Sequence, residues 1–132
     1  MFSFFKKKKF QKKEEIPQDS LSADEKVLLR GKILDLNKQL EQEGLAVAQQ
    51  ARLYEEVGLL QAKLGETNVA IETLEKSLDL KLTIGDGYKQ LMSLYNLKRA
   101  EAARDKDNEA IDYYMSKMDD MRNIAKKLTL TR

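Results

Sequence analysis

The sequence predicts an all-α fold, a short α-α superhelix of about five helices. From residue 21 onward, apolar residues recur at spacings of three and four, which places them on one face of a helix. No segment shows the sustained two-residue alternation that is typical of a strand. The only proline, Pro17, precedes this part of the chain, so it interrupts no later helix. These observations predict a single helical domain over residues 21–132.

The first 20 residues differ in composition from the rest and are predicted to form a flexible basic-aromatic arm and a linker. Residues 1–15 contain six lysines and two glutamates, whereas the whole chain has a net charge of only +2. The arm residues expected to contact a partner are Phe2, Phe4, Phe5, Lys6, Lys7, Lys8, Lys9 and Phe10. Aromatic rings beside ammonium groups suit an anionic membrane surface, and they also suit the bases and phosphates of RNA. A solubilising tail without a partner is the third interpretation.

The first helix of the domain is predicted to begin at a capping box, Ser22-Ala-Asp-Glu25, in which each of the two outer residues satisfies a backbone amide of the other. It should run to about Glu43, because Gly44 is a typical residue at a helix C-terminus. The apolar seam of this helix consists of Leu29, Ile33, Leu36 and Leu40. We expect this seam to pack against the second helix.

The four following helices are predicted at about residues 45–64, 67–82, 88–104 and 108–128. Gly65 should end the second helix, and Gly85-Asp-Gly87 should break the chain before the fourth. The polar residues 105–108 offer N-cap candidates for the last helix.

A register of small and large residues in the second and third helices indicates a helix hairpin that packs closely. Its members are Ala51, Tyr54, Val57, Gly58, Gly65, Ala70, Leu74 and Ser77. The register resembles that of the tetratricopeptide repeat family, in its small, bacterial-type form, with residues 51–84 matching the pattern of about 34 residues. Residues 91–124 resemble it at an offset of 40, with Lys98 and Lys117 where small residues are expected. The resemblance implies two helix hairpins behind an N-terminal capping helix.

In the resembled family, the first helix of each unit lines a groove that holds a protein or peptide partner. The positions that this implies here are Arg52, Glu55, Leu59, Lys63, Tyr95 and Arg99. Cationic groups and a tyrosine suit the carboxylates and apolar side chains of a peptide. The resemblance therefore implies a non-catalytic adaptor, although the same residues also fit ordinary solvated helix faces. The sequence does not identify the partner.

The last predicted helix carries Met115, Met118 and Met121 at helical spacing. On an uncovered terminal surface, these flexible thioethers would suit an adaptable contact or a homodimer seam. The alternative is a core stripe folded under the preceding helix. A homodimeric structural module without a groove ligand is accordingly the main alternative to the adaptor.

The composition disfavours catalysis, because the chain has no cysteine and no histidine. The paired carboxylates Asp119-Asp120 point about 100° apart on a helix and do not share a site. We therefore expect no enzyme activity, no metal and no cofactor. The slightly acidic remainder of the chain also argues against nucleic-acid binding by the helical domain.

The apolar start of the chain is too short for the core of a signal peptide or for a membrane span. A cytoplasmic location is therefore expected, with peripheral attachment at the inner membrane face if the arm binds lipid.

Overall fold

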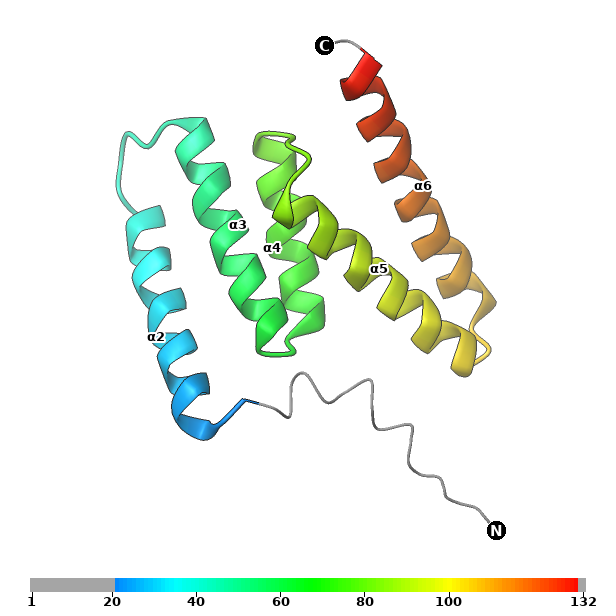
Figure 1. Cartoon of the computed structure of the whole chain (residues 1–132), viewed down its shortest axis with the longest axis horizontal. Coiled ribbons are helices and arrows are strands. Elements are labelled where there is room, and N and C mark those ends of the chain that lie inside the picture. Colours follow the sequence, from blue (N-terminus) through cyan, green and yellow to red (C-terminus); the bar gives the residue numbers. More distant parts are fainter. Residues whose placement is uncertain (1–20, 131–132) are drawn as a thin grey trace.

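The computed structural model of the protein describes residues 21–130, and this part of the chain is helical throughout, apart from the connecting turns. Its helices are α2 (Ala23–Leu40), α3 (Val47–Lys63), α4 (Thr67–Leu80), α5 (Asp86–Arg104) and α6 (Asn108–Leu130). Each helix packs against the next one along the chain (Figure 1). The prediction of an all-α fold is confirmed.

Helix α2 begins with the predicted capping box. The Glu25 amide donates to Ser22 Oγ at 3.1 Å, and the Ser22 amide donates to Glu25 Oε1 at 2.8 Å. The helix ends at Leu40, three residues earlier than expected. Arg30 also ties α2 to the start of α4, since its guanidinium lies 2.6 Å from the Glu66 carboxylate.

Helices α3 and α4 form a hairpin that is held close by small residues. A Cβ atom at Gly58 would lie 2.6 Å from Cγ of Leu74, so only glycine permits the observed approach. Deeper in the same contact, the buried Ser77 hydroxyl donates to the Ala51 carbonyl at 2.7 Å. Gly65 turns the chain between the two helices with a left-handed φ of 81°.

Two glycine-to-alanine substitutions in helices should therefore change stability in opposite directions. Gly58→Ala is expected to lower the free energy of unfolding by about 1–3 kcal/mol, because the fully buried Leu74 side chain has no space to move into. Gly31→Ala in α2 should raise it by about 0.5–1 kcal/mol, because no atom lies within 4 Å of the added methyl group and alanine favours the helix. Urea unfolding followed by circular dichroism measures both, and a Gly58→Ala variant as stable as the unchanged protein would contradict the close contact at Gly58.

Helices α5 and α6 form a second hairpin. Its residues repeat those of the first hairpin at an offset of 41 residues. Lys106 has a left-handed φ of 58° and makes the turn that Gly65 makes in the first hairpin, with the same pattern of backbone hydrogen bonds. A lysine ammonium lies over a tyrosine ring in each hairpin, at 5.0 Å and 5.8 Å from the ring centroid. Equivalent residues are Leu53 and Leu94, Tyr54 and Tyr95, Gly65 and Lys106, and Lys76 and Lys117. The predicted offset of 40 is thus wrong by one residue.

The second hairpin is more open than the first, and the corrected register explains why. Large residues replace the small ones of the first hairpin: Arg99 for Gly58, Ile111 for Ala70 and Met118 for Ser77. Without small residues at these positions, α5 and α6 cannot approach along their whole length. Figure 1 shows the two helices diverging from their turn, whereas α3 and α4 lie side by side.

The start of α5 differs from the sequence-based expectation, because Asp86 and Gly87 lie inside the helix instead of breaking it. The Gly87 amide donates to Glu55 Oε2 at 2.8 Å, so a carboxylate of α3 satisfies an amide at the beginning of α5. A Cβ atom on Gly87 would lie 2.7 Å from that same oxygen. The glycine therefore serves the contact between the hairpins and does not end a helix.

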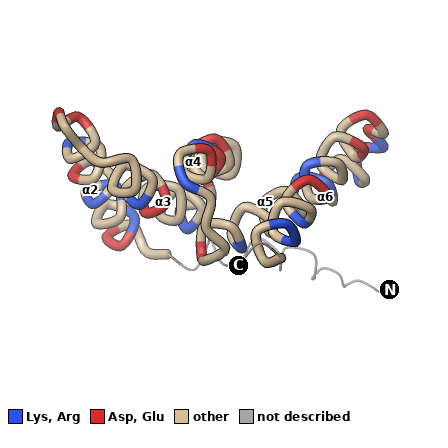
Figure 2. Tube along the Cα trace, turned by 90° about the horizontal axis from the view of Figure 1, so that it is seen from above, with Lys and Arg blue, Asp and Glu red and all other residues tan. Residues whose placement is uncertain are grey.

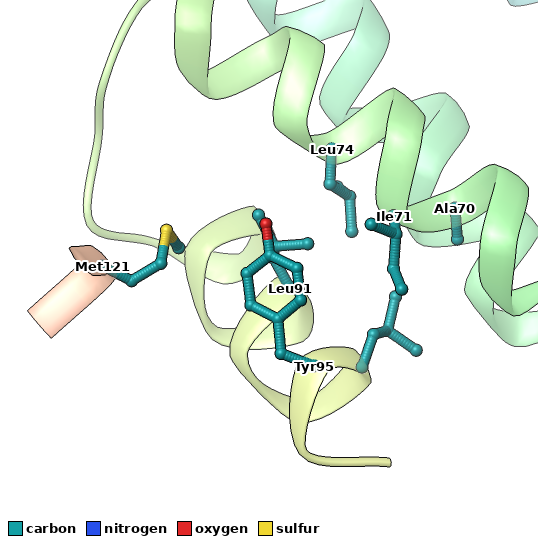
Figure 3. Packing of buried hydrophobic residues seen from close by; sticks show 7 residues of the cluster. Ala70, Ile71, Leu74, Leu91, Tyr95 and Met121 are labelled. Carbon is teal, nitrogen blue, oxygen red and sulfur yellow. The ribbon is translucent and has the colours of Figure 1, made fainter. Parts of the chain in front are cut away.

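The core that joins the hairpins lies where α4, α5 and α6 meet. Its buried residues are Ala70, Ile71, Leu74, Leu91, Leu94, Tyr95 and Met121. Figure 3 shows the Tyr95 ring rising from α5 towards α4, with Met121 of α6 nearby. Within residues 21–130, no helix combines the length and the apolar character that crossing a membrane requires.

Candidate functional site

Two hollows lie between α4 and α6, and we call them together the α4/α6 groove. Figure 2 shows α4 and α6 standing on either side of α5, which lies lower. The first hollow has a volume of about 380 Å³ and the second of about 400 Å³, each within the usual range of ligand pockets. Both are lined by Glu75 and Tyr95, which stand between them.

The first hollow combines an apolar lining with charged side chains. Its apolar residues are Leu78, Leu82, Leu91, Met121 and Ile124. Asp79, Lys117 and Asp120 join Glu75 as its charged groups. The second hollow adds the phenol rings of Tyr113 and Tyr114, which pack edge to face with centroids 5.0 Å apart. The groove therefore offers apolar surface next to charge.

Tyr95, Glu75 and Lys117 form a polar cluster at the middle of the groove. The Tyr95 hydroxyl donates to Glu75 Oε2, and Lys117 Nζ lies 3.6 Å from the same oxygen. Burial, and then the adjacent Glu75 carboxylate, raise the pKa of Tyr95 well above its usual value, which favours the protonated phenol that donates to Glu75. The cluster fixes the side chains that separate the two hollows.

Carboxylates outnumber ammonium groups in the groove. Those that line it are Glu72, Glu75, Asp79 and Asp120, and Lys117 is the cation among them. Lys117 is paired with Glu75, while the ion pairs within residues 21–130 engage none of the other three carboxylates. The groove thus presents uncompensated negative charge around an apolar floor.

The predicted groove residues do not come together in one groove. Arg52 and Glu55 line a hollow of about 190 Å³ on another side of the first hairpin. Leu59 lines a third region, of about 390 Å³, between α2 and α3. Tyr95 is only 2% exposed and lies in the α4/α6 groove, not on the open face that was expected.

Of the remaining predicted groove residues, neither lies in the α4/α6 groove. Lys63 is exposed near the end of α3. Arg99 is half-buried and donates to the side chain of Asn96 on its own helix at 3.0 Å. Glu55, as described above, is committed to the Gly87 amide.

The three methionines of α6 divide between the two alternatives. Met121 is 8% exposed and belongs to the core, so for this residue the core alternative holds and the exposed seam does not. Met118 is partly buried against the same core, and Met115 is 47% exposed. In the corrected register, Met115 is the equivalent of Leu74, which α5 covers. Among the described helices, none follows α6 to cover Met115.

Sequence reasoning did not find the acidic side of the groove, although the sequence contains a signal for it. Glu72, Glu75 and Asp79 recur at spacings of three and four, which places them on one face of α4. That face borders the apolar stripe of Ile71 and Leu78. The arm residues predicted to contact a membrane or RNA, from Phe2 to Phe10, lie outside the described residues.

Within residues 21–130, no group of three or more carboxylates is placed so that it could hold a metal ion. The chemical capacity of the α4/α6 groove is to bury apolar side chains and to attract cations.

Comparison of the chain with known protein families, with curated proteins and with solved structures finds no match.

Proposed function

We propose that the protein is a non-catalytic adaptor of the tetratricopeptide type that binds a basic, apolar segment of a partner protein in the α4/α6 groove. The observation that carries this proposal is the apolar lining of the groove beside Glu72, Asp79 and Asp120, which have no ion pair among the described residues. Lysine and arginine side chains would satisfy these carboxylates, while aromatic or aliphatic side chains fill the hollows.

The tetratricopeptide interpretation is supported by the two consecutive helix hairpins and by their common turn geometry. The contact between Gly58 and Leu74 also follows the small-and-large register on which the resemblance depends. Groove binding of a peptide by packed helices is a common mode of recognition in helical proteins.

A peptide titration with the full chain tests the proposal. The probe is an acetylated peptide of alternating lysine and phenylalanine, and its affinity is measured by calorimetry. The double substitution Asp79→Lys and Asp120→Lys should weaken binding at least about tenfold, because it reverses two charges at the groove. A peptide with glutamate in place of lysine should bind at least about tenfold more weakly to the unchanged protein.

The matched control is Asp35→Lys with Glu56→Lys, which changes the net charge equally at the hollow between α2 and α3. This variant should bind the basic peptide with nearly the affinity of the unchanged protein. Equal weakening by both double variants would mean that the peptide responds only to overall charge, and the proposal would then be wrong.

A further inference from the structure

The α4/α6 groove has a chemical counterpart within the same chain. Residues 1–13 carry six lysines and no acidic residue, together with Phe2, Phe4, Phe5 and Phe10. The remainder of the chain contains more acidic than basic side chains. The arm thus combines the cations that would satisfy Glu72, Asp79 and Asp120 with aromatic rings that would fill the hollows between them.

The N-terminal segment is also long enough to reach the groove. Arg30 lies 2.6 Å from Glu66, the residue that precedes α4, and Asn68 two residues later already lines the groove. Ala23, the first residue of α2, is about 11 Å from Arg30 along the helix axis. Residues 11–22 span up to about 40 Å when extended, so residues 2–10 can be placed at the groove without any movement of the helices.

We propose that residues 2–10 dock in the α4/α6 groove of the same molecule and thereby compete with the partner segment. The inference rests on the proposed function, since it names an internal ligand for the same groove. Attachment to the chain gives the arm an effective concentration of about 1 mM, so docking within one molecule outcompetes docking between molecules in dilute solution.

Tryptophan fluorescence tests this docking, because the chain contains no tryptophan. In the full chain with Phe5→Trp, the emission should be shifted to the blue relative to a free peptide of residues 1–13 carrying the same substitution. Adding Asp79→Lys and Asp120→Lys should return the emission to that of the free peptide. The matched Asp35→Lys and Glu56→Lys control should retain the blue shift.

Three results would overturn the proposal. The first is an emission equal to that of the free peptide in the full chain. The second is a blue shift that disappears on dilution, which would mean that the arm docks in a second molecule. The third is a blue shift that occurs only after vesicles of phosphatidylglycerol and phosphatidylcholine are added, which would assign the arm to a membrane.

A second measurement separates this inference from the proposed function. Phe4→Ser with Phe5→Ser should raise the apparent affinity for the lysine-phenylalanine probe about tenfold, if the arm binds with an intrinsic dissociation constant of about 0.1 mM. An unchanged affinity, with the probe still sensitive to the Asp79 and Asp120 substitutions, would reject arm docking and keep the adaptor. Arm docking in the unchanged arm, together with no probe binding even by the Phe4→Ser and Phe5→Ser variant, would keep this inference and reject the adaptor.

Discussion

Replacing Leu74 by alanine is expected to lower the free energy of unfolding by about 3–5 kcal/mol, through the lost burial and the cavity left behind. Leu74 is 0% exposed. It contacts Gly58 of α3 on one side and belongs to the core cluster with Leu91 and Tyr95 of α5 on the other. The substitution therefore loosens both the first hairpin and its contact with the second. Urea unfolding of the full chain measures the change.

Leu34→Ala is the matched control, since the same atoms are removed from a side chain that is 59% exposed on α2. Its effect should stay within about 0.5 kcal/mol. Similar losses from the two substitutions would contradict the placement of the core between α4 and α5.

Met121→Glu is expected to destabilise the protein by about 3–5 kcal/mol, because it places an unpaired carboxylate in the core beside α5. Met121 is 8% exposed, and its carbonyl accepts a hydrogen bond from the Tyr88 hydroxyl at 3.0 Å. The main consequence should be the loss of α6 from the rest of the bundle. Circular dichroism during urea unfolding reports this as a lower midpoint than that of the unchanged protein.

Met115→Glu provides the comparison on the same helix, because Met115 is 47% exposed. It should change stability by no more than about 0.5 kcal/mol. It is also the better probe of self-association through α6, since a change in solution mass would not be confused with unfolding. Equal destabilisation by the two substitutions would contradict the orientation of α6.

The local part of the fold could be predicted because its causes lie close together in the sequence. The capping box at Ser22 and Glu25 spans four residues, and helical periodicity is visible within a window of about 11–18 residues. The small residues of the first hairpin likewise indicated a close contact, which the structure places at Gly58 and Leu74.

The predicted register of the second hairpin is wrong because it pairs Ala70-Ile71 with Ala110-Ile111, although the sequence contains a better signal. That signal is the dipeptide Leu53-Tyr54, which returns as Leu94-Tyr95. With the predicted offset of 40, Tyr95 is aligned with Glu55, and it is therefore expected on the open face of the hairpin. With the observed offset of 41, it takes the place of Tyr54 and packs inward.

The groove itself could not be predicted from periodicity, because its width depends on how far α6 diverges from α5. That divergence follows from Arg99, Ile111 and Met118 at positions where the first hairpin has small residues. Their effect becomes visible only when the correct register is known. The hydrogen bond between Gly87 and Glu55 is equally hidden, since it joins two helices that are separated in the sequence by the whole of α4.

The hydrogen bond between Glu55 and Gly87 also makes the start of the second hairpin depend on a side chain of the first. Helices α3 and α4 close on each other through contacts of their own, at Gly58 with Leu74 and at Ser77 with Ala51. By contrast, α5 takes the acceptor for an amide of its first turn from α3. The amide of Gly87 is therefore satisfied only while α3 lies beside the start of α5, so loss of the Glu55 side chain would expose a weakness at the beginning of the second hairpin.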